Sequence, residues 1–251
     1  MTHPAPDHDT AKRRNQLVLE YLKVRRALGG LGVLLPAALL VYAALPAGAM
    51  QPSISEFYYT HMDGFLVGCL CAIGVFLASY KGYPRDPARG EWLSDRVLTL
   101  AAGLGAFGVA LFPVRNPATP NLCTDPITVG LECHAGLLHF GSAALFLVAI
   151  ALMSIFQFTR KDRGPMPGNR ILWTSHNILY VACGAVMLAA IGVLGLVAMV
   201  PAIKSFAGRV NLIFWAETVA VLAFATAWLV KSKSLDRPLA ALSRLGAQAG
   251  R

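Results

Sequence analysis

The chain has 251 residues, of which 56% are hydrophobic and 14% are charged, and its mean hydropathy is +0.56. Several stretches approach the roughly 20 apolar residues that a helix needs to cross a bilayer, so the composition argues against a soluble protein and predicts an integral membrane protein. The net charge of +9 does not indicate nucleic acid, because the basic residues are divided among segments beside the apolar stretches instead of forming an aromatic-interleaved patch.

The first apolar stretch, from about Ala27 to Ala49, follows a polar and basic N-terminal segment over 1–26 that includes the pattern of a short interfacial helix. Its end at Ala47-Gly48-Ala49 imitates a signal-peptide cleavage site. The apolar stretch is longer than the roughly 7 to 15 residues of a signal sequence, and the charged leader before it is long. We therefore expect an uncleaved first span, which contains Pro36.

Five further spans are expected along the chain, and the connections between them are too short for a second folded domain. The fold class expected is therefore all-α: one bundle of six transmembrane helices over 27–230, followed by a tail over 231–251. The five later spans are Met62–Tyr80, Val97–Pro113, Ala135–Phe158, Ile171–Val200 and Asn211–Val230. Segments 50–61, 114–134 and 201–210 are expected as loops on the side opposite the termini.

The distribution of basic residues predicts the orientation of this bundle. Of the 22 Lys and Arg residues, all but Arg115, Lys204 and Arg209 fall on one side of the membrane if the six spans are correct. Because positively charged loops stay on the cytoplasmic side, both termini are expected in the cytoplasm, with the chain in a bacterial inner membrane or a plasma membrane.

Small residues at four-residue spacing predict where the helices pack. In lipid, helices associate through faces on which small side chains let the backbones approach closely. We interpret these faces as packing surfaces, which also offer a route to homo-oligomers. The two stripes are Gly64, Gly68 and Ala72 in the second span, and Ala102, Ala106 and Ala110 in the third.

The five cysteines divide by their predicted environment. Cys123 and Cys133 fall in one external loop, where an oxidising compartment permits a disulfide; two free thiols or a metal-binding pair are the alternatives. Cys69, Cys71 and Cys183 fall within spans, where cysteine is usually a small apolar side chain. The spacing of Cys69 and Cys71 differs from that of a thioredoxin-like pair, so a disulfide oxidase is not expected.

Ionisable residues within the predicted spans gather toward the outer side and form the candidate site. A carboxylate at the centre of a span costs roughly 2.5 to 3.5 kcal/mol, so Glu217 is expected to face the bundle and to have a partner or carry a proton. Candidate partners are His61, His139, Arg209 and the hydroxyl of Tyr58 or Tyr59. The predicted polar pocket is lined by Ser53, Ser55, Glu56, Tyr58, His61, Asp63, His139 and Glu217.

A structural interpretation of the same residues is also open: interface anchors plus one hydrogen bond between the helices of Glu217 and His139. No metal is predicted, because His61, Asp63, His134 and His139 show no i, i+4 pair that would place two ligands on one helix face. No other cofactor is predicted either. No Lys or Arg lies within the core of a predicted span, so no side chain there could form a Schiff base with retinal. His139 and His176 fall near opposite membrane faces, too far apart to bind one haem.

The order of features, a first span, the external segment Ser53-Ile54-Ser55-Glu56 and six crossings with both ends inside, resembles the damage-regulated autophagy modulators and their uncharacterised bacterial relatives. The resemblance implies a lipid-associated membrane protein and no catalytic residues. The seven-span ceramidase-like hydrolases provide a second comparison, but this chain lacks their closing His-x-x-x-His pair and their seventh span.

The function expected from the sequence is the binding of a lipid headgroup or small ligand in an outward-facing polar pocket, with membrane lipids as partners. One alternative is a membrane hydrolase in which His61, Asp63 and His139 hold a metal or activate water, with Glu217 as general acid or base. The other alternative is a small-molecule transporter.

Overall fold

The computed structural model describes residues 8–82, 93–114, 131–162 and 173–234, apart from the side chains of 8–19, 131–135 and 161–162. Helices and no strands occur in these four ranges. They are α1 (His8–Ala44), η1 (Ser55–Tyr59), α2 (Asp63–Ser79), α3 (Asp95–Leu111), α4 (Leu131–Leu152), the π-helical η3 (Met153–Gln157), η4 (Phe158–Asp162), α5 (Ser175–Met199), α6 (Pro201–Arg209) and α7 (Leu212–Lys231).

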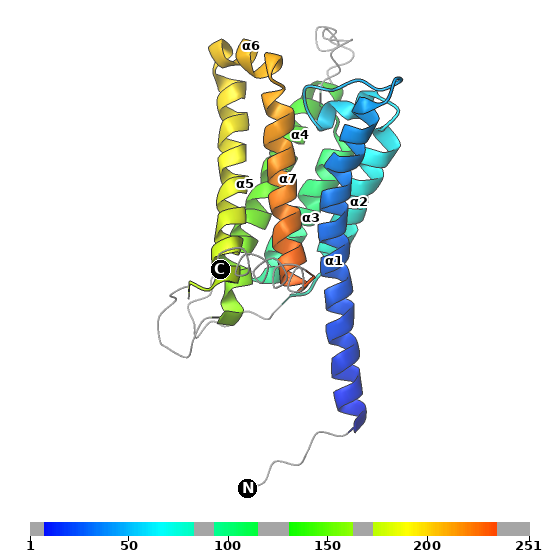
Figure 1. Cartoon of the computed structure of the whole chain (residues 1–251), viewed down its shortest axis with the longest axis vertical. Helices are drawn as coiled ribbons and strands as arrows, with labels where there is room; N and C mark the ends of the chain where they lie inside the picture. Colours follow the sequence, from blue (N-terminus) through cyan, green and yellow to red (C-terminus); the bar gives the residue numbers. More distant parts are fainter. Residues whose placement is uncertain (1–7, 83–92, 115–130, 163–172, 235–251) are drawn as a thin grey trace, which may run out of the picture.

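The long helices stand side by side in chain order, and α7 returns to pack against α1 (Figure 1). Consecutive helices run in opposite directions. Helix α6 lies at the same end of the bundle as η1, and we call this the η1 end. The opposite end, where α7 finishes and beyond which the first turns of α1 project, is the tail end. Both ends of the described chain thus lie on the same side, as an even number of crossings requires.

Four helical segments are long and apolar enough to cross a membrane: Glu20–Ala44, Gly136–Arg160, Ser175–Met199 and Leu212–Lys231. They correspond to four of the six predicted spans. Helix α2 is apolar but shorter, and α3 has the same 17-residue length and begins with Asp95 and Arg96. Six crossings and cytoplasmic termini therefore stay predictions. The secondary structure of the described residues is all helical, and four of the helices are suited to a membrane by their length and composition.

Two boundaries differ from those expected. Helix α1 ends at Ala44, five residues before the predicted limit of the first span, because Leu45 precedes Pro46 and a residue before proline avoids the helical conformation. The segment expected as a loop after the fifth span is instead the short helix α6. It begins at Pro201, whose fixed backbone torsion and missing amide suit the first position of a helix.

Small residues bring α3 against its neighbours, as predicted. Ala102 and Ala106 are completely buried. A Cβ added at Gly105 would lie 2.6 Å from the backbone nitrogen of Phe146 and 2.7 Å from the carbonyl oxygen of Ser142, so α3 and α4 touch backbone to backbone there.

The stripe on α2 behaves differently from the stripe on α3. Gly64 and Gly68 are exposed, and a Cβ at either position would meet no atom within 4 Å. At these two positions the face therefore packs against no described element of the chain. Contact with a second copy through it stays a prediction.

The tail end is held together by cations and aromatic rings. Arg25 is nine-tenths buried and donates to the hydroxyl of Tyr80 at 2.8 Å, and its guanidinium also donates to the carbonyl of Lys231 at 3.3 Å. Lys231 in turn donates to the carbonyl of Phe158 at 2.6 Å. Trp228 packs edge-on against both Tyr80 and Phe158, which joins these groups into one layer.

Candidate functional site

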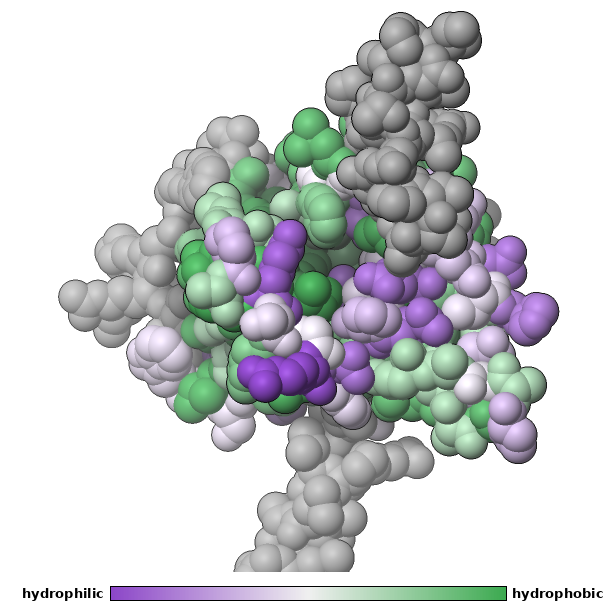
Figure 2. All heavy atoms as spheres, turned by 90° about the horizontal axis from the view of Figure 1, so that it is seen from above, coloured by the Kyte–Doolittle hydropathy of each residue, from purple (hydrophilic) through white to green (hydrophobic). Residues whose placement is uncertain are grey.

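The segment between α1 and α2 folds over the η1 end and is pinned there by one aromatic side chain. Phe57 is fully buried, with its ring 6.2 Å from that of Tyr42 and 6.0 Å from that of Phe214. The backbone amide of Phe214 donates to the carbonyl of Pro52 at 2.9 Å. The segment is therefore attached to both the end of α1 and the start of α7. Figure 2 looks onto this end and shows hydrophilic residues near its middle and on part of its edge, with hydrophobic residues elsewhere along the edge.

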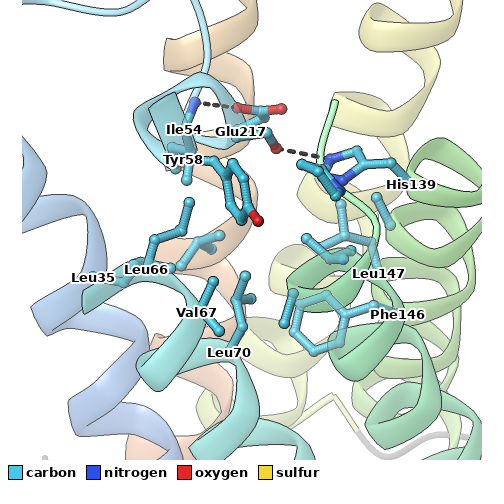
Figure 3. A pocket seen from close by; sticks show the side chains of 16 residues that line it. Leu35, Ile54, Tyr58, Leu66, Val67, Leu70, His139, Phe146, Leu147 and Glu217 are labelled. Carbon is cyan, nitrogen blue, oxygen red and sulfur yellow. Dashed lines mark hydrogen bonds between the residues drawn. The ribbon is translucent and has the colours of Figure 1, made fainter. Parts of the chain in front are cut away.

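Two hydrogen bonds then place polar groups of this segment against the long helices (Figure 3). The backbone amide of Ile54 donates to Oε2 of Glu217 on α7 at 2.6 Å. The next residue, Ser55, has its Oγ 2.9 Å from Nε2 of His139 on α4. Glu217 and His139 are thus brought to the same site by adjacent residues of one loop.

The backbone determines which nitrogen of His139 carries the proton. Nδ1 lies 2.7 Å from the carbonyl oxygen of Phe112, at the end of α3. A carbonyl oxygen only accepts, so Nδ1 is the protonated donor. In the neutral ring Nε2 then has a free lone pair, which accepts the hydroxyl hydrogen of Ser55. His139 is 3% exposed, so this arrangement is shielded from bulk water.

A cavity opens beneath these polar groups. It offers about 70 Å³ to the centre of a water-sized sphere, several times the roughly 10–15 Å³ that one water requires. Figure 3 shows Glu217, His139 and Tyr58 toward one end and Leu70 and Phe146 toward the other. The complete lining is Leu35, Ile54, Ser55, Tyr58, Leu66, Val67, Leu70, Val109, Ala110, Pro113, His139, Ala143, Phe146, Leu147, Glu217 and Val221.

Four of the residues predicted to form the pocket line this cavity: Ser55, Tyr58, His139 and Glu217. The cavity is not the polar pocket that the sequence suggests, because twelve of its sixteen lining residues are apolar. The polar groups instead form a rim at one end. An apolar cavity with a polar rim is the usual form of a site for an amphipathic ligand.

The other four predicted residues lie beside the cavity or away from it. Ser53 is buried, and its Oγ accepts a hydrogen bond from the amide of Glu56 at 3.1 Å. Partial burial raises the pKa of the Glu56 carboxyl above its ordinary value. His61 and Asp63 are exposed and do not line the cavity.

The hydrolase that holds a metal through His61, Asp63 and His139 finds no support in this geometry. Within the described ranges, no group of three or more His, Cys, Asp or Glu side chains is placed to bind a metal ion. The side chain of His134 lies outside the described residues, as do Cys123 and the side chain of Cys133, so the predicted disulfide between them falls there as well. Cys69, Cys71 and Cys183 are free thiols.

The pairing of Ser55 with His139 was not foreseen from the sequence. The two residues are 84 positions apart, and no spacing rule connects a loop serine to a histidine on a distant helix. The role of Phe112 was also missed, since a backbone carbonyl has no sequence signature. The sequence also gives no sign of the apolar lining from α2 and α4, because nothing in a run of apolar side chains separates those that face a cavity from those that face lipid.

No protein-family model, curated protein or solved structure matches the chain. The resemblance to the damage-regulated autophagy modulators accordingly stays a prediction from the sequence.

Proposed function

We propose that this protein is a six-span membrane protein whose cavity at the η1 end holds one amphipathic lipid. The hydrocarbon chain lies among the apolar residues of α2, α3 and α4. The polar head meets the rim formed by Ser55, Tyr58, His139 and Glu217. The observation that carries the proposal is the division of one cavity into an apolar depth and a polar rim at one end.

The chemistry of the rim indicates the kind of head that it accepts. Glu217 offers a carboxyl group, and Tyr58 offers a hydroxyl that both donates and accepts. A lipid head that carries hydroxyl groups next to a carbonyl would form hydrogen bonds with both Glu217 and Tyr58. A hydrophobic chain gains about 0.8 kcal/mol for each methylene buried from water, so the apolar depth supplies most of the affinity when a lipid arrives from solution.

The location of the rim follows from the proposed orientation. Residue 217 is five positions after the start of α7, so at 1.5 Å per residue it lies about 8 Å from that end of the helix. This is a shallow depth, near the boundary between headgroups and acyl chains. The outward side is assigned from the basic residues: Lys204 and Arg209 lie at the η1 end, whereas Arg25, Arg160 and Lys231 lie toward the tail end.

Native mass spectrometry of the purified protein with added 1-oleoylglycerol tests the proposal. Ala143 lines the cavity from α4, so Ala143→Phe fills it; Leu145 on the same helix is 45% exposed, so Leu145→Phe adds a similar ring on the outer surface. We expect wild type and Leu145→Phe to bind one lipid, and Ala143→Phe to bind it at least about tenfold more weakly, a difference of about 1.4 kcal/mol. Equal binding by the two variants would place the lipid elsewhere and refute the proposal.

A further inference from the structure

The pair formed by Ser55 and His139 has the geometry of an activated nucleophile. The serine hydroxyl lies 2.9 Å from Nε2, within the range expected between a nucleophile and its general base. The base is itself oriented by a third group, because Nδ1 donates to the carbonyl of Phe112 at 2.7 Å. Such a nucleophile, base and orienting group form the constellation that recurs in acyl-transfer enzymes on unrelated folds.

The position of the pair in the cavity indicates the class of substrate on which it acts. Both side chains line the cavity, at the rim where the head of a lipid would meet its chain. An ester of a fatty acid carries its carbonyl at that junction. We infer that Ser55 and His139 transfer the acyl group of a membrane-borne carboxylic ester, an inference that rests on the proposed binding of an amphipathic lipid in this cavity.

Two neighbouring residues have distinct parts in this reaction. Glu217 accepts the amide hydrogen of Ile54, the residue immediately before the nucleophile, so it is a positioning residue that holds the loop in register with His139. Tyr58 lines the same cavity, and Figure 3 shows its hydroxyl directed into the space. It is the donor available to the oxygen that becomes negative when the carbonyl carbon is attacked.

The reaction proceeds in two balanced steps. Oγ of Ser55 bonds to the ester carbonyl carbon as its proton moves to Nε2 of His139. The carbon–oxygen bond to the alcohol then breaks, and the alcohol leaves with that proton. A water molecule next gives a proton to Nε2 and bonds to the acyl carbon. The bond to Oγ breaks, Ser55 recovers the proton, and one ester and one water have become one acid and one alcohol.

A fluorophosphonate with a long alkyl chain tests the inference on the full-length protein in detergent. Oγ of an activated serine displaces fluoride from phosphorus, and peptide mass spectrometry identifies the modified residue. We expect labelling at position 55 in wild type and in Ser205→Ala, whose serine is exposed on α6. Ser55→Ala should not be labelled there, and His139→Gln should be labelled about 100-fold more slowly.

Release of oleate from 1-oleoylglycerol, measured on the same samples, gives the catalytic readout. We expect release by wild type and Ser205→Ala, and none by Ser55→Ala. If wild type binds 1-oleoylglycerol but neither reacts with the fluorophosphonate nor releases oleate, the pair is only a structural tether; the acyl-transfer inference fails and the proposed lipid binding survives. If wild type does not bind the lipid either, both fail.

Ser55→Cys keeps the test valid if His139→Gln does not fold. A thiol in place of the hydroxyl would face the same base, which withdraws its proton. We expect iodoacetamide to alkylate Cys at position 55 faster than the partly exposed Cys71 in the same molecule at neutral pH. Slower alkylation at position 55 would show that His139 does not activate the side chain and would overturn the inference.

Discussion

The backbone amide of Ile54 and the carboxylate of Glu217 are joined by a hydrogen bond of 2.6 Å, although 163 positions separate them in the chain. The bond connects the segment between α1 and α2 to α7. It also explains how a carboxyl group is accommodated about 8 Å into an apolar helix, since a backbone donor compensates part of its lost hydration. The same contact sets the position of Ser55, the next residue, against His139.

Removal of the carboxylate should loosen this end of the bundle. Glu217→Ala leaves the amide of Ile54 without its acceptor, and we expect a loss of about 1–3 kcal/mol in stability. Glu217→Gln keeps a carbonyl oxygen at the same place and should lose less. Thermal unfolding in detergent, with hydrogen exchange of residues 52–60, measures both effects. If the alanine variant shows the same exchange as wild type, the bond does not hold the segment.

The contact between α3 and α4 should tolerate no side chain at Gly105. A Cβ there would meet backbone atoms of α4 at 2.6 and 2.7 Å, so the two helices must separate. We expect Gly105→Ala to cost about 1–3 kcal/mol, as overpacking does in other cores. Gly68→Ala is the matched control, because a Cβ at that position meets nothing within 4 Å. The measurement is the unfolding midpoint of each variant, which should be lower for Gly105→Ala than for Gly68→Ala. Equal midpoints would contradict the close packing of α3 against α4.

Asp95 and Arg160 should be energetically coupled at the tail end. Their side chains are 3% and 11% exposed, and Oδ1 of Asp95 lies 3.3 Å from a guanidinium nitrogen of Arg160. Removing one partner of a buried pair leaves the other charge uncompensated, so Asp95→Ala alone should cost about 3 kcal/mol. Asp95→Ala combined with Arg160→Ala should cost less than the sum of the two single changes. A double-mutant cycle that shows no coupling would mean that each residue is held by other partners.

Stability should depend on pH through Glu56. Burial raises the pKa of this carboxyl in the folded protein above its ordinary value of 4.5. The folded state therefore binds the proton more tightly than the unfolded state, and stability falls as pH rises through the folded pKa. We expect the unfolding temperature of wild type to fall more than that of Glu56→Gln between about pH 4 and about pH 7. Parallel curves for the two proteins would show that Glu56 does not contribute.

The orientation of the bundle has a direct test at Ser205, an exposed residue of α6 at the η1 end. The distribution of basic residues predicts that this end lies outside the cytoplasm. In a background without the five native cysteines, Ser205→Cys in intact cells should react with a membrane-impermeant maleimide added from outside. Reaction only after the membrane is opened would show that the η1 end lies in the cytoplasm. A lipid would then enter the cavity from the cytoplasmic leaflet.

The four long apolar helices were predictable because helices in lipid must satisfy their own backbone hydrogen bonds, so long apolar stretches leave few alternatives. The packing of Ala102 and Ala106 was predictable for a related reason: small residues at helical spacing indicate close approach. Gly64 and Gly68 show the same spacing but contact no other helix of the described chain. The spacing identifies the helix face that carries small side chains, but it does not identify what packs against that face.

The sequence by itself determined that the protein is helical and apolar, and that Glu217 and His139 belong near one end of the bundle. Only the tertiary structure decided that Glu217 bonds to the amide of Ile54 and that His139 faces Ser55. It also decided that the cavity between them is mostly apolar. The physical reason is that hydropathy and spacing are local properties of the chain, whereas a cavity and a pair of residues 84 positions apart depend on how separate helices pack against one another.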